Sequence, residues 1–333
     1  MKNILEVKDL KVSFHTYAGE VQAVRGVSFE LKEGEVLAIV GESGCGKSVT
    51  SQTIMRLIPT PPSVIKEGSI LFDEDKVDLL QLTSKEMESI RGSEIGMIFQ
   101  DPMTSLNPTM TIGKQIAEGL VKHQGLTKEK AQKQAIELLT MVGIPRPETR
   151  IKQYPHEFSG GMRQRVMIAI SLACRPKLLI ADEPTTALDV TIQAQIIDLL
   201  KELQEKMGSS IIMITHNLGV VADIAQRVAV MYAGKIVEQG TVDDIFYRSR
   251  HPYTKGLLHS VLRLDDEEKG ELVPIEGMPP DLLAPPDGCA FAARCPYALN
   301  ICLKEDPQPQ MIQGEHSAAC WLMDKRVKKA DIR

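Results

Sequence analysis

The apolar and polar positions along the chain predict short strands alternating with helices. Residues 6–14 and 27–31 alternate apolar with polar side chains, as half-buried strands do. Residues 36–40 form a continuous apolar run, which is typical of a strand covered on both faces. Further strands are expected at residues 95–99, 178–181, 211–215, 228–231 and 235–238. This alternation indicates an α/β core with a parallel sheet.

Helical spacing is clearest between these strands. The pattern predicts helices at residues 48–57, 112–123, 128–141 and 162–173. One face of a further long helix is marked by Ile192, Ile196, Ile197, Leu200 and Leu203. Because residues 101–158 read as mostly helical, we interpret them as the body of an insertion into the core, ending near residue 165.

The composition changes after about residue 250. Prolines crowd residues 274–286, and four of the six cysteines lie beyond them. We therefore expect one large domain over residues 1–250 and a separate, mostly looped appendage over residues 251–333.

Charge and hydropathy exclude two classes of protein. Asp and Glu outnumber Lys and Arg by 44 to 39, for a net charge of −5, so general nucleic-acid binding is not expected. No apolar run approaches the roughly 18–20 residues that span a bilayer. The acidic residue Glu6 stands within the first residues of the sequence, which is unlike a signal peptide. We therefore expect the chain to stay in the cytoplasm, where thiols are reduced. Its cysteines are then expected to be buried residues or metal ligands rather than disulfides.

Residues 41–48, Gly-Glu-Ser-Gly-Cys-Gly-Lys-Ser, fit the phosphate-loop pattern between a buried strand and a helix. Glycines let successive backbone N–H groups surround a phosphate, and the start of the following helix attracts the same anion. Lys47 is expected to neutralise the β- and γ-phosphates, and the Ser48 hydroxyl to bind Mg²⁺. The predicted ATP-binding residues here are Gly41, Ser43, Gly44, Cys45, Gly46, Lys47, Ser48 and Val49.

A second candidate catalytic motif follows the apolar strand at residues 178–181. Asp182 and Glu183 stand at its carboxyl end, where ligands of α/β proteins collect. We expect Asp182 to hold Mg²⁺ through water and Glu183 to act as general base on the attacking water.

Residues 158–162, Phe-Ser-Gly-Gly-Met, complete a set of three ordered motifs. Together they resemble the ABC ATPase family from about residue 3 to residue 250. The resemblance implies a P-loop NTPase fold: a RecA-like core, an antiparallel β subdomain and a helical insertion. It also implies ATP hydrolysis coupled to the closure of a dimer.

The resemblance assigns further roles. Gln100 corresponds to the residue that senses Mg²⁺ and the γ-phosphate, and it joins Ser48 and Asp182 as a magnesium-site residue. Residues 187–189, Ala-Leu-Asp, match the loop at the dimer seam, which brings Asp189 close to the nucleotide. His216 matches the switch histidine, and Phe14, or otherwise Tyr17, the aromatic that stacks on adenine.

The motif at residues 158–162, which matches the signature of the family, also has a physical explanation. Ser159 is expected to cap the following helix, with the N–H groups of Gly160 and Gly161 exposed to an anion. In the family each chain's signature covers the ATP of the other chain. This sequence departs from the family at Met162, where a polar Gln is usual; either Gln164 supplies that function or the site is weaker.

The region after residue 250 resembles a narrower group within this family. Residues 251–255, His-Pro-Tyr-Thr-Lys, and the setting of Cys289, Cys295, Cys302 and Cys320 resemble ATP-binding subunits of dipeptide and oligopeptide importers. The resemblance implies a [4Fe–4S] cluster on these four cysteines. Zinc is the alternative, although the tight Cys-x-x-Cys spacing usual for zinc is absent, and unligated buried cysteines are a third reading.

The resemblance implies that the chain is the motor of a peptide importer at the cytoplasmic face of the membrane. The implied partners are two membrane permeases, a second ATPase subunit or a second copy of this chain, and indirectly an extracytoplasmic solute-binding protein. Alternatives are an importer of nickel or another small solute, and a soluble ABC ATPase acting on nucleic acid or ribosomes. A regulator without turnover is disfavoured by Glu183.

Overall fold

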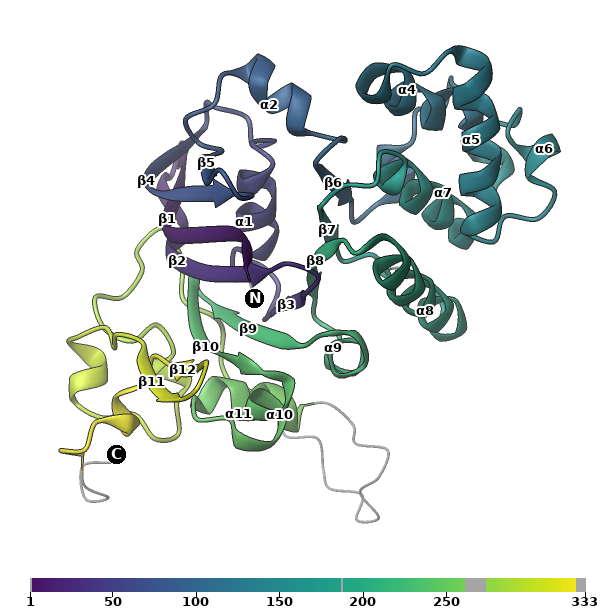
Figure 1. The fold of residues 1–333 in the computed structure, drawn as a ribbon. Coiled ribbons are helices and arrows are strands. Elements are labelled where there is room, and N and C mark those ends of the chain that lie inside the picture. Colours follow the sequence, from purple (N-terminus) through teal and green to yellow (C-terminus); the bar gives the residue numbers. More distant parts are fainter. Residues whose placement is uncertain (1, 187, 261–273, 328–333) are drawn as a thin grey trace. The chain divides into compact units, whose positions relative to one another are not determined.

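The computed structural model describes residues 2–186, 188–260 and 274–327 (Figure 1). They form two compact units that interleave along the chain. Among the described residues, the first comprises residues 2–5, 31–36, 72–186 and 188–214, and the second comprises residues 6–30, 37–71, 215–260 and 274–327. Each unit is described by itself.

Parallel strands carry the chemistry of the first unit. Strand β6 (Ile95–Ile98) pairs with β7 (Leu178–Asp182), which pairs with β8 (Ser210–Thr215). Every residue of these strands is buried, which explains their unbroken apolar runs. The strands predicted at residues 95–99, 178–181 and 211–215 are confirmed to within one residue at each end.

A group of helices occupies the chain between β6 and β7, as predicted for the insertion. Helices α4 and α5 pack on each other and on α7, and Figure 1 shows α4, α5, α6 and α7 gathered into one body. The bounds of α5 are those predicted from its spacing. The elements of this body are α3 (Pro102–Ser105), α4 (Ile112–Gln124), α5 (Lys128–Met141), α6 (Pro147–Arg150), the 3₁₀ helix η1 (Pro155–Glu157) and α7 (Gly160–Leu172).

Three more elements belong to the first unit. Helix α8 (Val190–Met207) buries four of the five residues predicted for its inner face. Helix α2 (Ser84–Ile90) begins at a capping box, in which Thr83 and Glu86 bond to each other's backbone N–H. Strand β5 (Val77–Asp78) lies just before it.

The second unit combines parallel and antiparallel pairs. Strand β3 (Val36–Val40) is parallel to β9 (Arg227–Tyr232), and β10 (Lys235–Thr241) runs antiparallel to β9. Strand β12 (His316–Ala318) then pairs with β10, and β11 (Gln310–Gln313) pairs with β12. The helices are α1 (Lys47–Ile54), α9 (Leu218–Ile224), α10 (Val242–Arg248) and α11 (Pro252–His259).

A sheet in which β1 lies between β2 and β4 belongs mostly to the second unit. It is built from β1 (Asn3–Thr16), β2 (Gly19–Lys32) and β4 (Ser63–Phe72). The alternating patterns predicted β1 and β2, but β4 was missed. Residues 65–68 in its middle are all exposed, so β4 shows no regular alternation.

The segment after residue 250 contributes to a core of the second unit. Tyr253 and Phe291 are buried in one apolar cluster with Ala38, Val40 and Tyr232. This segment also contains three short 3₁₀ helices, η2 (Ala292–Arg294), η3 (Ile301–Leu303) and η4 (Trp321–Met323). The C-terminal segment therefore shares apolar packing with the strand that leads into the phosphate loop.

Candidate functional site

The phosphate loop has the strand–turn–helix setting that its sequence predicted. It joins β3 to α1, and its glycines adopt positive φ angles, including 154° at Gly41 and 101° at Gly46. A Cβ atom on Gly41 would lie 2.1 Å from the carbonyl oxygen of Met231, and one on Gly46 would lie 2.4 Å from that of Ala23. Both positions therefore require glycine.

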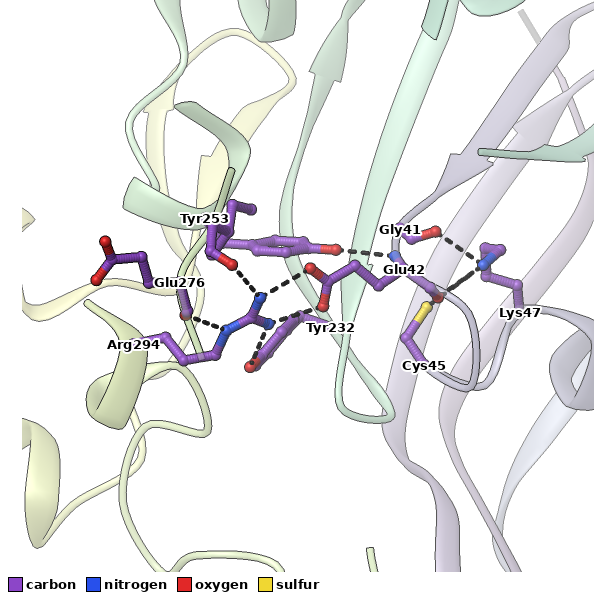
Figure 2. Close-up of polar contacts among 9 residues, drawn as sticks. Gly41, Glu42, Cys45, Lys47, Tyr232, Tyr253, Glu276 and Arg294 are labelled. Carbon is purple, nitrogen blue, oxygen red and sulfur yellow. Dashed lines mark hydrogen bonds and ion pairs between the residues drawn. The ribbon is translucent and has the colours of Figure 1, made fainter. Parts of the chain in front are cut away.

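Lys47 is buried inside this loop. Its Nζ donates hydrogen bonds to the carbonyl oxygens of Gly41 and Glu42, both at 2.9 Å (Figure 2). No side chain caps the start of α1, because the cap residue is Gly46. A buried cation and an uncapped helix start in one glycine-lined turn suit a bound phosphate.

The first unit holds the carboxylates of the second motif. Asp182 ends β7 and is 3% exposed. Glu183 follows it with a φ of 47°, a conformation that costs a non-glycine residue energy and is found preferentially at functional sites. The N–H of Glu183 donates to the carbonyl of Ile214 at 2.8 Å, which ties this strained residue to β8.

Two neutral donors hold the Glu183 carboxylate. Gln100 Nε2 and Thr186 Oγ1 each donate to Oε2 at 2.9 Å. The structure thus brings together Gln100 and Glu183, which the sequence predicted separately. Thr186 was missed, because a threonine three residues after the glutamate carries no recognisable signal.

The signature segment begins a helix as predicted. Ser159 is the N-cap of α7, and its Oγ accepts from the N–H of Met162 at 3.4 Å. Ser159 and Gly160 are exposed. Asp189 caps α8 in the same way, accepting from the N–H of Ile192 at 2.9 Å. Ala187, in the predicted seam loop, lies outside the described residues.

Gln164, one of the two alternatives raised by Met162, lies in the interior of the first unit. This residue is only 2% exposed, since it lies on the buried side of α7.

The remaining predicted ATP contacts lie in the second unit. His216 is exposed directly after β8, and Asn217 beside it caps α9. Phe14 is half-buried on β1, whereas Tyr17 stands fully exposed in the turn between β1 and β2.

The predicted metal centre on the four C-terminal cysteines is not supported by their arrangement among the described residues. Across the described residues, no three His, Cys, Asp or Glu side chains are placed to hold a metal ion. The cysteines are free thiols near one another, and Cys302 packs with Ala292 and Leu299. Burial, reinforced by the neighbouring thiols, raises the pKa of Cys289 to about 11 and that of Cys320 to about 12. Four thiols are nevertheless the donor atoms that iron and zinc take in proteins.

Comparison with known proteins first shows the broad class to which the protein belongs. Residues 24–186 match the ABC transporter family. A dimeric ATP-binding cassette solved in a post-hydrolysis state with ADP and Pi has a similar fold, with a TM-score of 0.64 and 29% sequence identity. That likeness covers 72% of this chain and 98% of the other. The fold and the phosphate loop are those of an ABC nucleotide-binding domain.

The relatives then narrow the class. Residues 237–302 match the C-terminal region of oligopeptide/dipeptide transporters. The oligopeptide transport ATP-binding protein OppD of Bacillus subtilis (strain 168) is 62% identical over 328 residues, covering 98% of this chain and 91% of the relative. The dipeptide transport ATP-binding protein DppD of the same strain is 58% identical over 330 residues, covering 99% and 98%. The chain belongs to this family of ABC transporter ATP-binding proteins.

Among the described residues, none of the helices combines the length and apolar character needed to cross a bilayer.

Proposed function

We propose that this chain binds and hydrolyses Mg²⁺·ATP to drive the import of dipeptides or oligopeptides through separate membrane permeases. The observation that carries the proposal is the phosphate loop, with Lys47 enclosed by it and two glycines that no other residue could replace. The peptide cargo rests on the names of the relatives that match nearly the whole chain.

Hydrolysis is assigned to the residues of the second motif. Asp182, Ser48 and Gln100 would hold Mg²⁺, which would neutralise charge on the phosphates, and Gln100 would also sense the γ-phosphate. Glu183, held by its two hydrogen bonds, orients and deprotonates the attacking water. His216 contacts the γ-phosphate.

The complete site needs a second protomer, which is another copy of this chain or a related ATPase subunit. The capped helix start at Ser159, with Gly160 and Gly161, contacts the triphosphate bound to the other protomer's loop. Asp189 lies at the seam. Nucleotide then favours the closed dimer, and hydrolysis removes that preference.

A groove in the first unit suits a cytoplasmic segment of a permease. This cavity of about 740 Å³ lies beside α4 and α5. Its lining combines apolar Ala117, Val121 and Ile151 with Lys114, Lys122, Lys128 and Lys152. An apolar segment flanked by acidic residues complements this surface. Such docking would place the chain at the cytoplasmic face of the membrane.

The test is a pair of measurements on Lys47→Ala. The variant should lose ATPase activity, and membranes that contain it with the permeases should not accumulate a radiolabelled dipeptide or tripeptide. Full turnover by the variant would refute the phosphate-site assignment. Turnover by the native protein without peptide uptake, alongside uptake of nickel, would favour the alternative cargo.

We further infer that Cys289, Cys295, Cys302 and Cys320 bind a [4Fe–4S] cluster, with zinc as the alternative. Cys289 lies three residues before η2 and Cys295 directly follows it, whereas Cys302 lies in η3 and Cys320 caps η4. One cluster would therefore tie these 3₁₀ helices together. The Cys289 N–H donates to the carbonyl of Cys302 at 2.8 Å, and Cys289 packs against the apolar cluster that contains Cys302.

The cluster is tested on protein purified without oxygen. We expect brown protein containing iron, which Cys289→Ser loses and the control Cys174→Ser keeps. Colourless protein with stoichiometric zinc would support the alternative, and protein free of both metals would refute metal binding.

A further inference from the structure

An ion pair joins the C-terminal segment to the phosphate loop. Arg294 Nη1 donates to Oε2 of Glu42 at 2.8 Å, and Nη2 donates to Oε1 at 3.0 Å. The pair is bidentate, and the Arg294 side chain is only 5% exposed (Figure 2). Such geometry is stronger and more directional than an ordinary surface ion pair.

The surroundings hold Arg294 in place for this contact. Its Nε donates to the carbonyl of Glu276 at 3.0 Å, and Nη2 donates to that of Ile275 at 3.1 Å. Nη1 also donates to the Tyr232 hydroxyl at 3.2 Å. Five hydrogen bonds thus match the five N–H donors of the guanidinium group. Arg294 is pre-organised, so little freedom is lost when it holds Glu42.

The backbone of Glu42 is held as well. Its N–H donates to the hydroxyl of Tyr253 at 2.9 Å. Tyr253 is fully buried, and its ring lies 4.5 Å from that of Tyr232 and 5.5 Å from that of Phe291, between centroids. Both the main chain and the side chain of Glu42 are therefore anchored by residues after position 250.

This anchoring has an electrostatic consequence for a triphosphate. Figure 2 shows the Glu42 carboxylate pointing toward Arg294, with Lys47 on the opposite side of Glu42. A carboxylate free to turn into the loop would repel the phosphates and compete for Lys47. Arg294 neutralises this charge and directs it away from Lys47.

We propose that Arg294 and Tyr253 are positioning residues that hold the phosphate loop in its ATP-binding conformation. The inference rests on the proposed ATPase function and extends it, because it makes the C-terminal segment part of the nucleotide site. Arg294 ends η2, which lies between Cys289 and Cys295. Nucleotide binding and the order of residues 289–295 are then linked, and linkage between two sites is reciprocal.

The first test measures the Kd of Mg²⁺·AMP-PNP by calorimetry. Arg294→Ala should raise the Kd on the order of tenfold, within the usual range of coupling between sites. Arg294→Lys keeps the positive charge but loses the bidentate guanidinium group. Its Kd should lie between those of the native protein and Arg294→Ala. The matched control is Arg326→Ala, which removes an exposed ion pair with Asp324 in the same segment.

A double-mutant cycle separates positioning from general loss of structure. In a Glu42→Gln background the carboxylate charge is gone, so adding Arg294→Ala should change the Kd by less than about twofold. Equal effects of Arg294→Ala in both backgrounds would refute the proposal. If Arg294→Ala does not fold, Tyr253→Phe carries the test, since it removes only the acceptor for the Glu42 N–H and should also raise the Kd.

The second test uses reciprocity. Mg²⁺·AMP-PNP should slow amide hydrogen exchange in residues 289–295 of the native protein but not of Arg294→Ala. Native protein that binds the nucleotide with unchanged exchange there would overturn this inference alone. Native protein that fails to bind the nucleotide would instead remove the proposed function.

Discussion

Gln100 donates a hydrogen bond from Nε2 to Oε2 of Glu183 at 2.9 Å, although 83 positions separate them in the sequence. Thr186 donates to the same oxygen. The Glu183 carboxylate is therefore oriented by two hydrogen bonds, and the residue proposed to sense Mg²⁺ contacts the residue proposed to activate water. Movement of Gln100 on nucleotide binding would free one side of the base.

Glu183→Gln should bind Mg²⁺·ATP but lose turnover by about 100-fold or more, because an amide cannot take the proton from water. Closed dimers should accumulate in the presence of ATP, and size-exclusion chromatography measures this accumulation. Glu202→Gln is the control, since Glu202 pairs with Lys206 on the exposed face of α8. Normal hydrolysis by Glu183→Gln would remove this residue from the mechanism.

Thr186→Val should lower kcat by about two- to tenfold with little change in KM, since one hydrogen bond that orients the base is lost. Thr186→Ser keeps a hydroxyl and should retain most of the activity. A change in KM with constant kcat would instead place Thr186 in substrate binding.

The two candidate aromatics should respond differently to substitution. Tyr17→Ala should weaken ATP binding by about fivefold to 100-fold, since Tyr17 is fully exposed and stacking on a base contributes about 1–3 kcal/mol. Tyr17→Phe, which keeps the ring, should bind normally. Phe14→Ala should mainly lower the unfolding temperature, because Phe14 is half-buried. Weakened nucleotide binding by Phe14→Ala alone would restore Phe14 as the stacking residue.

His251 should make folding stability depend on pH. Burial lowers its pKa to about 3, and its Nδ1 accepts from the N–H of Tyr253 at 3.1 Å. The folded protein thus binds this proton less readily than the unfolded chain, whose histidine has a pKa of about 6.5. The stabilising contribution is complete above about pH 6.5 and falls as the pH decreases toward 3.

Between pH 7 and pH 5 this residue should cost about 2 kcal/mol of unfolding free energy. Urea unfolding at both pH values, compared with His251→Asn, measures the effect. Asparagine can still cap α11 but does not titrate. Equal pH dependence in the two proteins would contradict the prediction.

The sequence alone determined the features that depend on neighbouring positions. Strand β3 and helix α5 have their predicted bounds, because their apolar spacing is regular and their ends carry clear signals. The phosphate loop and the cap at Ser159 were predicted for the same reason, since a glycine turn and an N-cap are local structures. Strand β4 lacked such a pattern and was missed.

Only the tertiary structure decided which distant residues meet. Arg294 and Glu42 lie 252 positions apart, and no pattern near either one predicts the pair. The burial of Gln164 and the placement of the four thiols were likewise settled by packing. The physical reason is that backbone hydrogen bonding and amphipathic spacing act over a few residues, whereas ion pairs and burial depend on which surfaces the folded chain brings together.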